Sequence, residues 1–178
     1  GLALDAVSAD LLVASAGRDA ALAGVEAASA ELSAGRDVTL AQGDYGRLTL
    51  NAGRNAAATG GRIDRADMRA GGGLALTGVV AGTLRAEAGT AALRDVEIAD
   101  ADLLARGDAQ VSGSRFDTLT AETERGDAAI ETSTFSTATL TAGGALSLAG
   151  LEGGVLSAGS VGGLDGTEIV VGEAAVTA

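Results

Sequence analysis

The sequence predicts an all-β protein, a right-handed parallel β-helix in which the chain winds into a rod. Three observations support this fold class. Glycines recur at a constant interval along most of the chain, apolar residues recur at fixed positions between them, and the apolar residues within each repeat come in closely spaced pairs. A repeat that stacks on its neighbours is typical of solenoid proteins. We therefore expect about ten coils of roughly 18 residues, each with three short strands.

The glycine period is the first of these observations. The segment "AGRD" occurs at 16–19 and again at 34–37, and "AGRN" follows at 52–55. The glycines of this register keep one constant spacing until the last step, which is one position longer: Gly17, Gly35, Gly53, Gly71, Gly89, Gly107 and Gly126. We expect a corner of the coil at these glycines, where a left-handed or tight backbone conformation favours glycine.

The apolar residues form six columns when the repeats are aligned. One column alternates large and small residues: Leu12, Ala30, Leu48, Ala66, Leu84. The neighbouring column compensates for it: Ala14, Leu32, Leu50, Met68, Ala86. Such compensation keeps a core of constant width densely packed. A further column contains the three aromatic residues, Tyr45, Phe116 and Phe135, so we expect them inside the rod, and no column contains a charge.

The spacing within one repeat defines the strands and their corners. Inward residues are paired at every second position, as in Leu74/Leu76, Val79/Ala81 and Leu84/Ala86, which is the period of a β-strand. The three pairs of one repeat follow one another at short and equal intervals in the sequence, whereas the interval to the first pair of the next repeat is longer. Two corners are therefore tight, and the third, with the register glycine, is long. This pattern does not fit the shorter period of left-handed hexapeptide β-helices, and parallel crossovers are overwhelmingly right-handed.

The repeats fill the whole chain, so residues 1–178 are expected to form a single β-helix segment. Neither end of the sequence shows a polar capping element, which solenoid proteins need for solubility. We therefore expect the segment to be a piece of a longer repeat filament.

Composition excludes several classes of partner. The net charge of −12 argues against nucleic acid and against anionic membrane surfaces as partners. The chain has no cysteine and no apolar run long enough to span a membrane, so we expect no disulfide, no thiolate metal site and no membrane insertion. No histidine or lysine is present, and general acid–base chemistry would require exposed carboxylates without a pocket. We expect no enzyme activity, no cofactor and no metal.

One corner repeats an arginine beside an acidic or amide residue. Arg18, Arg36 and Arg54 are followed by Asp19, Asp37 and Asn55. An anion-binding ladder is one interpretation. The other is that the aspartates and the asparagine offset the like charges and bond the exposed backbone.

The same corner carries two Arg-Gly-Asp triplets, at Arg106-Gly107-Asp108 and Arg125-Gly126-Asp127. An integrin ligand of this kind presents an arginine for receptor carboxylates and an aspartate that completes a metal site on the receptor. A structural origin is the alternative, because the glycines belong to the corner register and aspartate is common in turns. The six residues are candidate integrin-binding residues, and the second triplet lies in the longer corner.

The coils "AGRDVTLAQGDYGRLTLN" (34–51) and "AGGALSLAG" (142–150) resemble the repeats of filamentous haemagglutinin. This family comprises the large two-partner-secretion exoproteins of bacteria. The resemblance implies export by an outer-membrane transporter, β-helical folding outside the cell, and location in the medium or on the bacterial surface. It implies a rod-like stalk segment of an adhesin that attaches to host cells, with virulence as its context.

Two alternatives to an adhesin remain. One is a purely structural stalk of a contact-dependent inhibition exoprotein, in which this segment binds nothing. The other is a β-helical polysaccharide-active enzyme, which the short corners disfavour.

Overall fold

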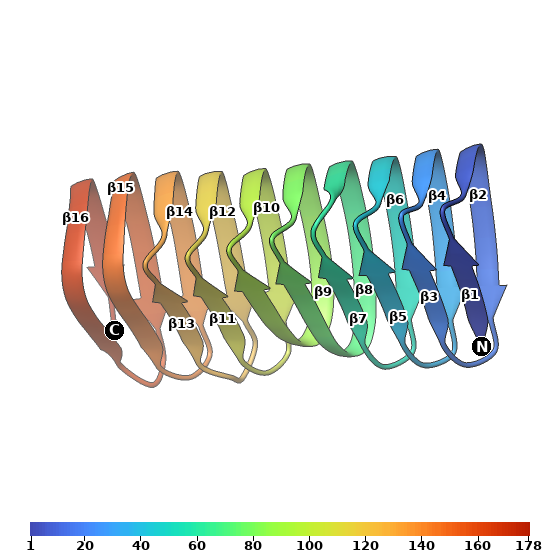
Figure 1. Ribbon diagram of the computed structural model, residues 1–178. Coiled ribbons are helices and arrows are strands. Elements are labelled where there is room, and N and C mark those ends of the chain that lie inside the picture. Colours follow the sequence, from blue (N-terminus) through green and yellow to red (C-terminus); the bar gives the residue numbers. More distant parts are fainter.

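The computed structural model describes residues 1–178 and shows a parallel β-solenoid of about ten turns with an 18-residue spacing (Figure 1). The chain rises along the near side of the rod, passes over its top and descends along the far side while it advances from right to left. This sense of winding is right-handed. The expected fold class is confirmed.

Most coils consist of a short strand followed by a longer one. The strands are β1 (Leu2–Asp5), β2 (Ser8–Ala16), β3 (Ala20–Ala23), β4 (Glu26–Ala34), β5 (Val38–Ala41), β6 (Asp44–Ala52), β7 (Ala56–Thr59), β8 (Arg62–Thr77), β9 (Val80–Arg94), β10 (Glu97–Ala105), β11 (Ala109–Ser112), β12 (Arg115–Thr123), β13 (Ala128–Glu131), β14 (Thr134–Ala142), β15 (Leu146–Ser160) and β16 (Leu164–Thr177).

The second member of the second inward pair and the whole third pair belong to one continuous strand with a bend, and in most coils the first member of the second pair lies just before this strand. In β6, Tyr45 and Leu48 are buried while Gly46 and Arg47 between them face outward. Two successive outward residues interrupt the alternation of a strand and turn the chain without breaking its hydrogen bonds to the next coil. Each coil therefore has three sides and three corners, but the strands end at only two of these corners. In β8, β9, β15 and β16 the strand continues through one of these two corners as well.

All neighbouring coils pair in parallel and in register. Leu48 pairs with Ala66 and Ala66 with Leu84, so the expected column of alternating large and small residues is a cross-strand stack. One coil is one residue shorter than its neighbour, which produces a register shift after Ala70 in the long corner. The insertion lies between Thr123 and Ala128, again in that corner. Length changes fall there because the strands are held by backbone pairing on both sides.

The core is a single cluster of 50 buried apolar residues that fills the inside of the rod. It includes the alanines of a seventh inward column that the sequence pattern did not reveal, at the end of the long strands, in which Thr123 is also buried: Ala34, Ala52, Ala70, Ala88, Ala105, Thr123 and Ala142. Alanine is also common on the outside of this rod, so its presence at an inward position gave no signal.

The aromatic residues lie inside, as expected. Tyr45 is 2% exposed, and a β-carbon at Gly43 would lie 2.7 Å from its Cζ, so glycine leaves the room that the ring occupies. The Tyr45 hydroxyl has no hydrogen-bond partner, and burial raises its pKa. Phe116 pairs with Phe135 in the neighbouring coil.

The expected left-handed backbone occurs at a different corner from the register glycines. Each coil has one residue with φ between 48° and 64° directly after its short strand or the equivalent segment: Ala6, Gly24, Gln42, Gly60, Gly78, Asp95, Gly113, Thr132, Gly150 and Glu168. None of the register glycines from Gly17 to Gly126 has a positive φ. Most of them are needed because the long corners stack closely: a β-carbon at Gly53 would lie 2.9 Å from the carbonyl carbon of Gly35, whereas one at Gly17 in the first coil would meet no atom within 4 Å.

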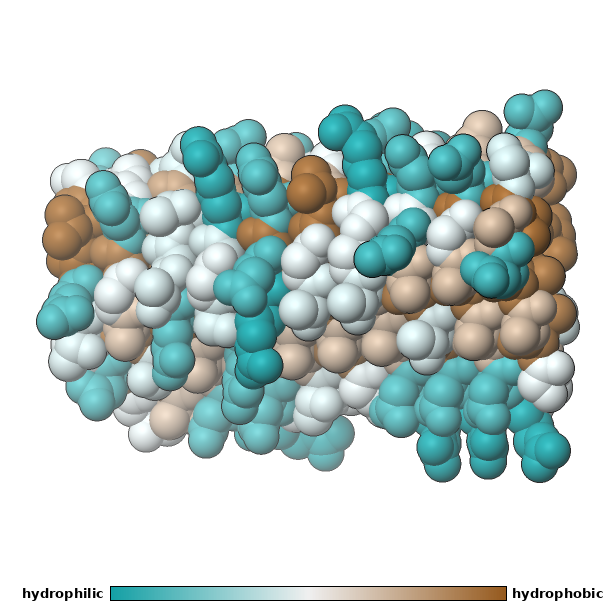
Figure 2. Space-filling view, in the orientation of Figure 1, coloured by the Kyte–Doolittle hydropathy of each residue, from teal (hydrophilic) through white to brown (hydrophobic).

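Polar side chains cover much of the side of the rod in view, and apolar surface gathers at its two ends (Figure 2). Large exposed apolar side chains occur in the first coil and in the last: Leu11, Val13, Val161, Val170 and Val176. The structure contains no helix that is long and apolar enough to cross a membrane.

Candidate functional site

The two Arg-Gly-Asp triplets stack on one another at the long corner. The first lies between β10 and β11, and the second lies one coil further, between β12 and β13. The backbone N–H of Asp127 donates a hydrogen bond of 3.0 Å to Oδ1 of Asp108. The structure therefore brings all six candidate residues into one patch, which we call the triplet corner.

The two arginines of the triplet corner differ in their contacts. The Arg106 guanidinium forms an ion pair of 2.8 Å with Glu87, and the two side chains are 50% and 42% exposed. Arg125 is exposed and makes no ion pair or side-chain hydrogen bond. Only the second arginine is free to approach another molecule without first leaving a partner.

The two aspartates of the triplet corner bond the backbone of the next coil. Asp108 accepts from the N–H of Asp127, and Oδ1 of Asp127 accepts from the N–H of Ala145 at 2.7 Å. In each carboxylate the second oxygen has no protein partner. The aspartates thus have a structural role, and each still presents one free oxygen to solvent.

The longer second corner is tied to the core by Thr123. This buried threonine donates a hydrogen bond of 2.6 Å from Oγ1 to the carbonyl of Gly126, and its Oγ1 accepts from the N–H of Gly143 at 3.3 Å. The threonine takes the place of the inward alanine found in most coils at this position. It adds a second hydrogen bond to each of two backbone groups that the ladder between the coils already pairs, the carbonyl of Gly126 with the N–H of Gly144 and the N–H of Gly143 with the carbonyl of Thr123.

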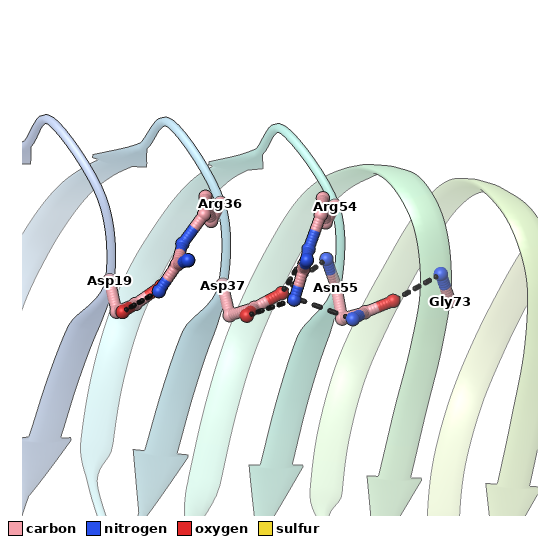
Figure 3. A network of polar contacts seen from close by, with 6 residues as sticks. All are labelled: Asp19, Arg36, Asp37, Arg54, Asn55 and Gly73. Carbon is pink, nitrogen blue, oxygen red and sulfur yellow. Dashed lines mark hydrogen bonds and ion pairs between the residues drawn. The ribbon is translucent and has the colours of Figure 1, made fainter.

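The long corner carries a chain of polar contacts in the coils near the amino-terminal end (Figure 3). Arg36 donates to both carboxylate oxygens of Asp19 at 3.0 and 2.6 Å, and Arg54 donates to those of Asp37 at 3.4 and 2.9 Å.

Asn55 continues this chain toward the next coil. Oδ1 of Asp37 accepts from the backbone N–H of Asn55 at 3.2 Å, and Oδ1 of Asn55 accepts from the N–H of Gly73 at 2.9 Å. The expectation that these residues offset the arginines and bond the backbone is confirmed for Arg36 and Arg54, whereas Arg18 makes no ion pair.

These contacts change the acidity of the aspartates. The hydrogen bond from Arg36 lowers the pKa of Asp19, and the hydrogen bond from Arg54 lowers the pKa of Asp37. Asp19 in turn raises the pKa of Arg36. The first ion pair thus favours the charged form of both Asp19 and Arg36, and the contacts of Asp37 favour its carboxylate form.

Replacing Asp37 with asparagine tests the pH dependence of this corner. Because the pKa of Asp37 is lowered on folding, its stabilisation is complete above its ordinary value of 3.8 and disappears as the pH falls through the lower folded value. Asp37→Asn should therefore melt at a lower temperature than the wild type at pH 7 and at the same temperature near pH 2. A difference between the two melting curves that persists at low pH would contradict the ion-pair account, and Asp44→Asn, at an exposed aspartate without an ion pair, is the control.

A groove crosses the outer face of the long strands β6, β8, β9, β10 and β12, and encloses about 580 Å³. We expected no pocket on this rod from its sequence. No inserted loop forms this groove. Its walls are the outward side chains of these long strands themselves. Its lining includes Arg47, Arg65, Arg85, Asp100 and Asp102.

Comparison of the chain with protein-family models, with curated proteins and with solved structures finds no match.

Proposed function

We propose that this chain is a rod-like stalk segment of a secreted bacterial surface adhesin of the filamentous haemagglutinin type, which takes part in attachment to host cells. The observation that carries the proposal is the uninterrupted stack of about ten coils in register, with one continuous core from end to end. Such a rod holds one part of a molecule at a distance from another. Export by an outer-membrane transporter and a location outside the cell belong to the same proposal.

The adhesive part of the proposal concerns the second triplet, Arg125-Gly126-Asp127. Its arginine has no partner in the protein, whereas Arg106 is paired with Glu87. Asp127 is exposed and has one free carboxylate oxygen, which is what a receptor-bound metal ion would require. An integrin is the partner that this arrangement suits.

A purely structural stalk is the second candidate, and a specific observation favours it. Both triplet aspartates are explained as backbone acceptors, in the same way as Asp37 and Asn55 at the equivalent corner. Neither aspartate needs a receptor to account for its presence. Catalysis forms no part of either candidate function.

Adhesion of integrin-bearing cells to the immobilised protein distinguishes these candidates. Asp127→Asn keeps an oxygen acceptor for the N–H of Ala145 but removes the charge that a receptor metal requires, so the fold should persist while adhesion falls at least fivefold. Asp108→Asn should have a smaller effect, and Asp37→Asn, at the equivalent corner outside the triplets, should have none. Equal adhesion to the wild type and to all three variants would refute the adhesive function and leave the structural stalk.

A further inference from the structure

The groove on the long-strand face carries chemistry that neither a stalk nor the triplets use. Its lining comes from five successive coils, which at a spacing of about 4.8 Å extend about 19 Å along the rod. Two rows of outward residues line it. The first row is Arg47, Arg65, Thr83, Asp100 and Thr118, and the second is Thr49, Asp67, Arg85, Asp102 and Thr120.

The groove begins in the one basic region of an acidic rod. Between residues 45 and 86 lie six of the twelve arginines but only two of the 24 acidic residues, although the chain as a whole has a net charge of −12. A local excess of positive charge attracts anionic groups over a distance of about 10 Å at moderate salt.

Half of these six arginines form ion pairs with acidic neighbours, and half do not. The paired ones contact aspartates at 2.9 to 3.4 Å: Arg54, Arg62 and Arg69. The other three have no carboxylate within 4.0 Å: Arg47, Arg65 and Arg85. All three line the groove, but Arg85 has Asp67 and Asp102 as direct cross-strand neighbours, so the positive charge available to a ligand is that of Arg47 and Arg65.

Arg47 and Arg65 are direct cross-strand neighbours in β6 and β8. Two like charges at such positions repel one another and weaken the pairing of their strands. An anionic group bound between them would remove this repulsion and would accept charge-assisted hydrogen bonds from both guanidinium groups.

The rest of the groove restricts the kind of anion that fits. Asp100 and Asp102 have no arginine partner and face the same groove, together with the threonines of both rows. An ionised carboxylate only accepts hydrogen bonds, so the ligand must also supply donors such as hydroxyl groups. These aspartates would repel a densely charged polyanion such as a polyphosphate or a polysulfate.

We propose that this groove binds an acidic oligosaccharide extended along the rod, with a uronate carboxylate between Arg47 and Arg65. The sugar hydroxyl groups donate to Asp100 and Asp102 and exchange hydrogen bonds with the threonines. The groove contains no aromatic side chain, so recognition rests on polar contacts rather than on stacking of sugar rings. This site is separate from the triplet corner and from the adhesive function proposed for it.

Titration calorimetry with an aldotetraouronic acid, in which one uronate is joined to three neutral xylose rings, tests the proposal on the whole chain. The wild type should bind this probe, and Arg47→Gln with Arg65→Gln should weaken binding at least tenfold. The control is Arg94→Gln with Arg115→Gln, which makes the same change in net charge at two arginines that have no ion pair and lie outside the groove. Both double variants should keep the melting temperature of the wild type within a few degrees.

Four results would overturn the proposal. The first is no binding of the aldotetraouronic acid by the wild type, and the second is equal weakening in the two double variants, which would reduce the effect to overall charge. The third is equal binding of neutral xylotetraose, which lacks the carboxylate. The fourth is equally tight binding of inorganic phosphate, which would assign the arginines to a simple anion. Asp127→Asn should leave binding of the aldotetraouronic acid unchanged, so the proposal for the groove and the proposal for the triplet corner can fail independently.

Discussion

Replacement of Leu119 by aspartate is expected to abolish folding of the rod. Leu119 is completely buried in β12, where it stacks between Ala101 of the preceding coil and Ala138 of the following one. A carboxylate at this position has no basic partner and no water, which costs several kcal/mol. Since single domains are stable by only about 5–15 kcal/mol, this one change consumes much of the total.

The architecture of the rod amplifies this effect. Each coil contacts only the coils next to it, so a failure in the middle separates the coils before it from those after it. Loss of the β signal in the far-ultraviolet circular dichroism spectrum is the measurement. Thr139→Asp, which places the same charge on the outside of the neighbouring strand β14, should leave the spectrum unchanged. A folded Leu119→Asp protein would show that the column does not face the core.

Replacement of Gly53 by alanine is expected to destabilise the rod by about 2 kcal/mol or more, although it adds only one methyl group. The new β-carbon would meet the carbonyl oxygen of Gly35 and lie 2.9 Å from its carbonyl carbon. Neither atom can move aside, because the corners are held together by the bond from the N–H of Arg54 to the carbonyl of Arg36 at 2.8 Å. The two coils must separate locally to admit the methyl group.

Gly17 provides a matched control for this substitution. It occupies the same register as Gly53, but a β-carbon there would meet no atom within 4 Å. Denaturant unfolding should therefore show a clear loss of stability for Gly53→Ala and little change for Gly17→Ala. Equal losses would mean that these glycines are required for their backbone conformation, as first expected, and not for close stacking of the corners.

Much of the fold could be predicted because the residues that face the core repeat at equal intervals. The columns through Leu48, Ala66 and Leu84 fixed the pairing of the coils, and the shortened and lengthened repeats differ only in the long corner, away from these columns. The left-handed corner could not be recognised in the same way. Only half of its ten positions are glycine, so residues such as Gln42 and Thr132 gave no sign of a positive φ.

The candidate sites were predictable to different degrees. The stacking of the triplets followed from their spacing, which is close to the length of one coil. The ion pair of Arg106 with Glu87 and the bond of Thr123 to Gly126 did not, because they depend on where long or inward side chains point. The groove was missed because its three arginines occupy two different outward columns, and only the inward columns show a regular pattern in the sequence.

Repeat length, inward columns and the place of the corners follow from the order of the residues alone, because burial of apolar side chains imposes one period on every coil. The tertiary structure alone decides which outward side chains contact one another. Residues about one coil apart in the sequence then become neighbours across a strand or corner, as Arg36 and Asp19 do, and their partners depend on side-chain direction as well as on spacing. Winding thus leaves Arg125, Arg47 and Arg65 without partners, and these three arginines are central to the functions proposed for this rod.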